Sequence, residues 1–182
     1  MNYKMMTDLE LLKLSIPDRY FKYSKAYGSA AKILAERIVK DKDQATWPNA
    51  AVILMLTAHS VELFLKGAIL KKDSKADRKI RHHHIESLYE MYCEIYKDEK
   101  YSFNLPFKTE YLGMSQAEID VLKKNRNKKN RNKYSEPSVL YRYPTASGES
   151  EWEGVYAFEA SSFFSKICQL LEDIHRLRKS FT

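Results

Sequence analysis

The sequence predicts an all-α protein: an up-and-down bundle of four long helices plus one short helix. Glycine and proline number five each in 182 residues, which leaves little turn material for a barrel or sandwich of many strands. Apolar residues make up 44% of the chain, enough for a buried core. Apolar side chains recur at steps of three and four residues over long segments, the periodicity of a helix with one buried face. The length fits a single domain over residues 1–182, with an N-terminal extension over 1–17.

Two segments predict the first pair of helices. The first runs from about Asp18 to Lys40, and one of its faces is apolar: Tyr20, Tyr23, Tyr27, Ala30, Leu34 and Ile38. The second runs from about Trp47 to Lys71, with Thr46 as its cap and Pro48 in the first turn, where a missing N–H costs nothing. Because residues 50–56 are apolar all round, we expect this helix at the centre of the bundle.

The second half of the chain predicts two further long helices and one short helix. The third helix runs from about His84 to Lys97 and has an apolar stripe: Ile85, Leu88, Tyr89, Tyr92 and Tyr96. Residues 98–149 predict an irregular connection that holds a basic segment and a short helix, whose capping box is Ser115 with Glu118. The last helix runs from about Val155 to Lys179. It keeps apolar residues at helical spacing throughout and turns Lys166, Glu172, Asp173 and Arg176 outward.

The net charge of +7 is concentrated in one segment, residues 122–133. This segment has seven basic residues and no acid: Lys123, Lys124, Arg126, Lys128, Lys129, Arg131 and Lys133. A second basic excess lies at 71–81, with six basic and two acidic residues. Concentrated positive charge suits contacts with phosphates, because neutralised phosphates release counterions. A phosphate-rich partner is therefore expected, and a solvated loop that keeps the protein soluble is the alternative.

Three polar side chains share one face of the otherwise apolar second helix: His59, Glu62 and Lys66. An unpaired buried carboxylate costs several kcal/mol, so Glu62 needs a partner. Lys66 lies four residues further on, in the favourable order for an ion pair, and His84 or Arg142 could reach Glu62 from elsewhere in the chain. The three interpretations are a structural polar network or exposed seam, a ligand or catalytic site, and an interface.

Other reactive residues give weaker signals. His82, His83 and His84 are consecutive, so their side chains diverge and no metal site is expected; one of them starts the third helix. Cys93 and Cys168 form no CxxC motif and are interpreted as small core residues. The tyrosines of the third helix could stack bases, or lie in the core with their hydroxyls at its rim. The chain has no Gly-rich phosphate loop and no G-x-S-x-G motif, and no cofactor is expected.

No targeting segment is apparent, so a cytoplasmic protein without membrane contact is expected. Charged residues interrupt every apolar run near the N-terminus: Lys4, Asp8, Glu10 and Lys13. Residues 50–70 are the most apolar stretch, yet they contain three ionisable groups, which argues against a membrane span.

Three segments together resemble the HEPN superfamily (higher eukaryote and prokaryote nucleotide-binding domains). AHSVELFLKGAIL at 58–70 is similar to the family's apolar helix with a Glu followed by a Lys. HHIESLYEMY at 83–92 is similar to the family's G-H-D-L start of the next helix, with His84 in the place of the family's His. NKYSEPSVLYRYP at 132–144 is similar to a loop that ends in Arg-Tyr-Pro, here beginning at Arg142.

The resemblance implies a dimeric helical module that binds RNA or a nucleotide without catalysis. Family members act in toxin–antitoxin, phage-defence or nucleotidyltransferase-partner systems. Ribonucleases of the superfamily carry R-x(4–6)-H and cleave RNA without metal at a dimer interface. Arg78 with His83 or His84 fits that spacing, so an endoribonuclease is the alternative. A third hypothesis is a protein–protein interaction subunit that binds a nucleotidyltransferase-like partner through its last helix.

Overall fold

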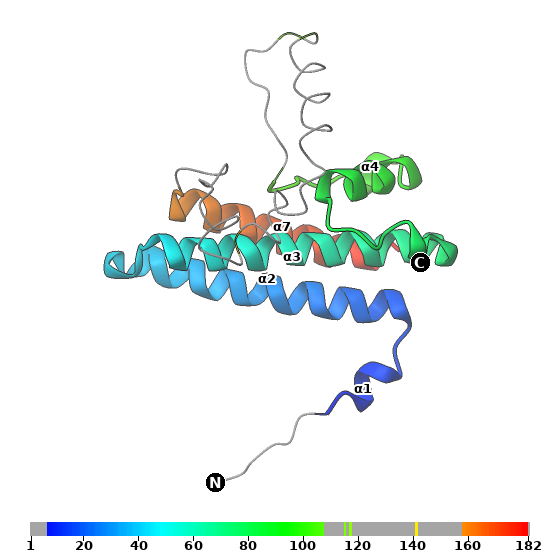
Figure 1. Cartoon of the computed structure of the whole chain (residues 1–182), viewed down its shortest axis with the longest axis horizontal. Helices are drawn as coiled ribbons and strands as arrows, with labels where there is room; N and C mark the ends of the chain where they lie inside the picture. Colours follow the sequence, from blue (N-terminus) through cyan, green and yellow to red (C-terminus); the bar gives the residue numbers. More distant parts are fainter. Residues whose placement is uncertain (1–6, 108–114, 116, 118–140, 142–157, 182) are drawn as a thin grey trace, which may run out of the picture.

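The computed structural model is built from helices (Figure 1). It describes residues 7–107, 115, 117, 141 and 158–181. Its α-helices are α1 (Leu9–Leu12), α2 (Ile16–Lys40), α3 (Trp47–Lys72), α4 (Ile85–Ile95) and α7 (Ala160–Ser180). Three short 3₁₀ helices join them: η1 (Lys42–Gln44), η2 (Ser74–Arg78) and η3 (Glu99–Tyr101). The predicted all-α bundle is confirmed, since the described residues contain no strand.

Helices α2 and α3 form a long antiparallel pair, and α7 runs beside them in the direction of α3 (Figure 1). Small residues let α2 and α3 approach closely. The hydroxyl of Ser24 donates to the carbonyl of Ser60, and the hydroxyl of Ser60 donates to the carbonyl of Ser24, both at 2.8 Å. A Cβ at Gly28 would lie 2.8 Å from Leu171 of α7. A side chain at this position would have to displace the end of the Leu171 side chain and the hydroxyl of Ser60, so glycine suits the close contact.

The start of α2 differs from the prediction because a capping side chain decides it, whereas α3 starts at Trp47 as predicted. α2 begins at Ile16, two residues before the predicted start, since Ser15 accepts a hydrogen bond from the N–H of Asp18. Thr46 occupies the N-cap of α3, but its side chain accepts no bond. α7 begins at Ala160, where the carboxylate of Glu159 accepts the first free N–H groups. The predicted start at Val155 lies outside the described residues.

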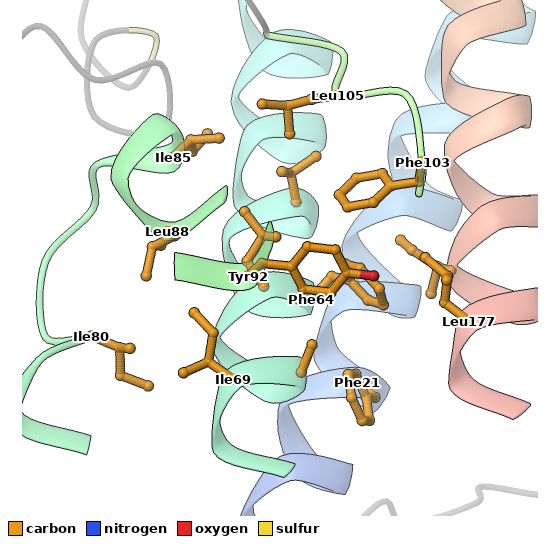
Figure 2. Packing of buried hydrophobic residues seen from close by; sticks show 14 of the residues in the cluster. Phe21, Phe64, Ile69, Ile80, Ile85, Leu88, Tyr92, Phe103, Leu105 and Leu177 are labelled. Atoms are coloured by element: carbon orange, nitrogen blue, oxygen red, sulfur yellow. The ribbon is translucent and has the colours of Figure 1, made fainter. Parts of the chain in front are cut away.

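Helix α3 is the buried centre of the bundle, as its composition predicts. Its long, apolar sequence could by itself cross a membrane, but 72% of that window is buried inside the protein. The main core gathers around the C-terminal half of α3 (Figure 2). There Phe64 packs on Phe21 of α2 and on Phe103, with ring centroids 5.9 and 5.4 Å apart. Leu88 and Tyr92 of α4 and Leu177 of α7 close the same cluster (Figure 2).

The fully buried face of α2 is centred on small residues rather than on its tyrosines. The residues buried in the bundle are Phe21, Ser24, Gly28, Ala31, Ala35 and Ile38. Of the predicted face, Ile38 is buried, Tyr20 and Leu34 pack against the core while partly buried, and Tyr23 is half exposed. Small side chains occupy the centre of the buried face because the close approach of α3 leaves no room for tyrosine rings. Asp173 of α7 was also expected outside but is buried, where it pairs with Arg176 at 2.9 Å.

Candidate functional site

A buried ion pair lies on α3, at the face that the α3–α4 connection covers. The carboxylate of Glu62 is almost fully buried, and its Oε1 accepts a hydrogen bond from Nζ of Lys66 at 2.8 Å. Lys66 is buried as well. The four-residue spacing on one helix holds the two charges together, which satisfies the requirement that a buried charge be paired.

His83 completes this pair from the other side. Its Nδ1 lies 3.0 Å from the same Oε1 of Glu62. A carboxylate can only accept, so the hydrogen must be on Nδ1. The bond fixes the ring at a position that leaves 43% of the side chain exposed, with Nε2 directed away from Glu62. The imidazole is thus oriented by a carboxylate and remains accessible.

The second oxygen of Glu62 lacks a hydrogen bond. Nδ1 of His59 faces it at 3.7 Å, which is too long for a bond, and both atoms are buried without a partner among the described residues. The ring of Tyr27 on α2 packs edge-on against His59, with centroids 4.5 Å apart. Buried orphan atoms are rare in folded proteins, so this pair marks the place where a water or a ligand group would be accepted.

The surroundings keep Glu62 ionised. Burial raises the pKa of its carboxyl group, but His59 and Lys66 beside it, with His83, lower it further, and the resulting pKa is about 2. Tyr20 of α2 lies within the field of this carboxylate. Its own pKa is raised by burial and by the charges of Asp77 and Glu62. At neutral pH the site therefore holds one fixed negative charge between a lysine and two histidines.

The structure brings some of the predicted residues together and separates others. His59, Glu62 and Lys66 form one cluster, as their spacing on α3 predicts. The long-range partner of Glu62 among the described residues is His83, whereas the sequence suggested His84 or Arg142 as possible partners. His84 is instead the N-cap residue of α4 and donates its backbone N–H to His82, because the chain turns there to start the helix.

Arg78 lies on η2 and is exposed. It forms no hydrogen bond or ion pair within the described residues. The other candidates from sequence lie outside them: Lys123, Lys124, Arg126, Lys128, Lys129, Arg131, Lys133 and Arg142. The predicted short helix also falls there, apart from Ser115 and Ala117.

The second basic excess is within the described structure. Residues 71–81, called the basic connection below, lead from the end of α3 through η2 toward α4. All six of their cationic side chains are exposed: Lys71, Lys72, Lys75, Arg78, Lys79 and Arg81. Of the two acids, Asp77 is paired with Arg81, and Asp73 accepts from the backbone N–H of Lys75. The connection thus presents positive charge directly before His83.

The tyrosines of α4 are committed to the fold. The hydroxyl of Tyr92 donates to the carbonyl of Tyr101 at 2.6 Å, and that of Tyr96 donates to the carbonyl of Ala68 at 2.9 Å. Burial raises the pKa of Tyr96 to about 12 and that of Tyr92 further. Of the two hypotheses for this stripe, the core interpretation agrees with these contacts, and stacking on bases does not.

Sequence reasoning missed three participants: His83 as the partner of Glu62, and Tyr20 and Tyr27 beside it. Residues 62 and 83 lie on separate elements, so no periodicity relates them. The one available signal was the need of a buried carboxylate for more than one donor, combined with a run of histidines at the end of a short connection. Among the described residues, no group of three or more His, Cys, Asp or Glu side chains could hold a metal ion.

Comparisons of this chain with protein-family models, curated proteins and solved structures give no match.

Proposed function

We propose that this chain is an RNA-binding helical module of HEPN type, which acts without catalysis. The observation that carries the proposal is the basic connection, where six exposed cations lie among eleven residues that lead to the oriented ring of His83. Exposed cations with few acidic residues among them are suited to bind the phosphate backbone of a nucleic acid. The segment at 122–133, rich in lysine and arginine, would add further phosphate contacts. A toxin–antitoxin, phage-defence or nucleotidyltransferase-partner setting follows from the HEPN resemblance alone.

The test is the salt dependence of binding to a labelled single-stranded RNA, followed by fluorescence anisotropy. Each phosphate contact contributes about 0.7 to the slope of log K against log salt for a single strand. Alanine at Lys75, Arg78 and Lys79 should reduce the slope by about 2 and weaken binding. Alanine at Lys128, Lys129 and Arg131 should act in the same direction.

The matched control removes three exposed lysines elsewhere on the bundle: Lys25, Lys97 and Lys179. It lowers the net charge equally but should leave the slope unchanged. Equal losses in the control and in the test variants would mean that only net charge matters. A wild-type affinity that does not vary with salt would refute the proposal. Binding of a free nucleotide but not of RNA would narrow the ligand to a nucleotide.

One observation favours a second function, a metal-independent endoribonuclease. An ionised carboxylate that holds Nδ1–H of an exposed imidazole is the arrangement in which histidine serves as a general acid or base. Arg78 on the same connection would neutralise a phosphate. Its signature is RNA cleavage in EDTA that is lost in His83→Ala and retained in His84→Ala. The absence of cleavage of a mixed RNA pool by pure wild-type protein would exclude this function.

A further inference from the structure

The outer face of α2 is apolar although it is exposed. Ile16, Tyr23 and Ile33 are 59%, 50% and 67% exposed, and Ala26 and Ala30 lie between them. These residues face away from the buried face of α2. In Figure 1, α3, α4 and α7 lie on the other side of α2, and the short helix α1 is the labelled element below it, near its N-terminal end. A surface helix normally carries charged and polar residues on this side. Helix α2 thus has one apolar face for its own bundle and a second without a partner in the described chain.

The outer face follows a heptad pattern, which sets it apart from scattered apolar residues. The a positions of the heptad are Ile16, Tyr23, Ala30 and Arg37. The d positions are Arg19, Ala26, Ile33 and Lys40. Spacings of seven with an offset of three place all eight on one stripe along the helix, the arrangement that packs a second helix. The four central positions are apolar, and the charged ones lie toward the ends.

Two copies of α2 match each other best when they run antiparallel. In that register Tyr23 lies opposite the partner's Ile33, and Ala26 lies opposite the partner's Ala30. The alanines allow close approach at the centre, and the large side chains fill the layers on both sides. A parallel pair would instead place Arg37 against the partner's Arg37 and Lys40 against the partner's Lys40, which like-charge repulsion opposes.

Charge complementarity at the flank selects the same register. The positions beside the stripe on one side are Lys22, Ser29 and Glu36. In an antiparallel pair these positions face each other, so Lys22 lies opposite the partner's Glu36, and the contact occurs twice. Lys22 is exposed and forms no ion pair within the described residues. Glu36 pairs with Lys40 on its own helix, but both side chains are exposed, so that bond contributes little.

The charged residues at both ends of the stripe limit the contact between the two copies, called the seam below, to the middle of α2. Arg19 would lie opposite the partner's Arg37. Its guanidinium is drawn back toward its own chain, where it donates to the carbonyls of Leu12 and Leu14. The repulsion at this layer is thereby reduced, and the contact depends on the central positions.

We propose that the outer face of α2 is the interface between two copies of this chain, which pair antiparallel through the central part of this helix, residues 22–36. The HEPN resemblance implies a dimer but names no surface. The seam follows from the exposed apolar stripe, its heptad spacing and the Lys22–Glu36 complementarity. It does not depend on RNA binding.

Sedimentation velocity of the full chain tests the interface. Wild-type protein should be a dimer at micromolar concentration, and Ile33→Glu should raise the dissociation constant at least tenfold. Val39→Glu is the matched control, since Val39 is exposed on α2 but off the stripe. Circular dichroism melting of each variant establishes that the bundle is folded. A wild-type monomer at about 100 μM, or a dimer that Ile33→Glu leaves intact, would overturn the proposal.

A charge swap tests the register. Lys22→Glu and Glu36→Lys should each weaken the dimer by about tenfold, because each sets like charges opposite one another twice. The double variant restores opposite charges and should recover wild-type affinity. Failure of the double variant to recover would reject the antiparallel register.

Cross-linking gives an independent readout. In a background with Cys93→Ser and Cys168→Ser, Ser29→Cys places two thiols beside the two-fold axis and should form a disulfide-linked dimer on oxidation. Lys25→Cys lies outside the stripe and should not. Equal cross-linking of the two variants would mean random collision and would count against the interface.

Discussion

The tyrosine cluster of α4 and the Glu62 cluster of α3 are both polar groups set into an apolar bundle, yet they differ in how their polar atoms are used. In the tyrosine cluster, Tyr92 and Tyr96 donate to backbone carbonyls of the chain itself. In the Glu62 cluster, one carboxylate oxygen and Nδ1 of His59 stay without a bond, and the ring of His83 is partly open to solvent. In both clusters the side chains recur at helical spacing along their helix, so spacing alone does not distinguish them.

The difference separates polarity that serves the fold from polarity that is available to a ligand. A hydroxyl that donates to a carbonyl contributes about 1 kcal/mol to stability and has no hydrogen left to offer. A carboxylate with an unused oxygen, beside an oriented imidazole, retains capacity for a further partner. The experiments below test this distinction, beginning with the largest expected effect.

Removal of the carboxylate should have the largest effect. Glu62→Ala leaves the buried ammonium of Lys66 without a counter-charge, and we expect a loss of about 3–5 kcal/mol in the free energy of unfolding. Urea denaturation at pH 7 measures it. Glu94→Ala removes an exposed glutamate from α4 and should change stability by less than about 0.5 kcal/mol. Similar losses in the two variants would remove the distinction between the clusters.

Acid should weaken the Glu62 cluster specifically. The folded pKa of Glu62 is about 2, below its ordinary value of 4.5, so its contribution is present above pH 4.5 and is lost as the pH falls toward 2. We expect it to amount to something on the order of 3 kcal/mol. Unfolding measured from pH 7 to pH 2 should therefore depend less steeply on pH in Glu62→Gln than in wild-type protein. Identical slopes would show that Glu62 is not held ionised.

The smallest effect is expected from the tyrosine cluster. Tyr92→Phe deletes the donor to the carbonyl of Tyr101 and should cost about 1 kcal/mol without changing RNA affinity. Tyr23→Phe is the control, since Tyr23 is half exposed and its loss of a hydroxyl should be neutral within about 0.5 kcal/mol. A large change in RNA affinity for Tyr92→Phe would mean that this cluster, too, contacts ligand.

Much of the fold could be predicted from periodicity and composition. Helix α3 is apolar all round, and only a central position accommodates such a helix. The error on α2 has a physical origin. Both of its faces are apolar, and the predicted face combined the half-exposed Tyr23 with the partly buried Tyr20 and Tyr27, whereas the inner face is built from small residues such as Ser24, Gly28 and Ala31. Periodicity counts apolar residues but does not register how closely two helices must approach.

The candidate site was predictable only where its residues share a helix. His59, Glu62 and Lys66 follow from spacing along α3, while the contact of His83 depends on how the basic connection folds back over α3. That path is determined by capping bonds and turns, which sequence spacing describes poorly. The orphan oxygen of Glu62 could not be foreseen at all, since it results from a separation of 3.7 Å from His59.

The reciprocal bonds between Ser24 and Ser60 have a consequence for how the bundle can move. Sliding α2 along α3 by one helical turn, about 5.4 Å, would break both hydrogen bonds and leave the two buried hydroxyls without acceptors. It would also separate Gly28 from Leu171 of α7. These contacts therefore oppose sliding of α2 relative to α3. A further partner of Glu62 would therefore have to approach from the side of His83, whose side chain is 43% exposed.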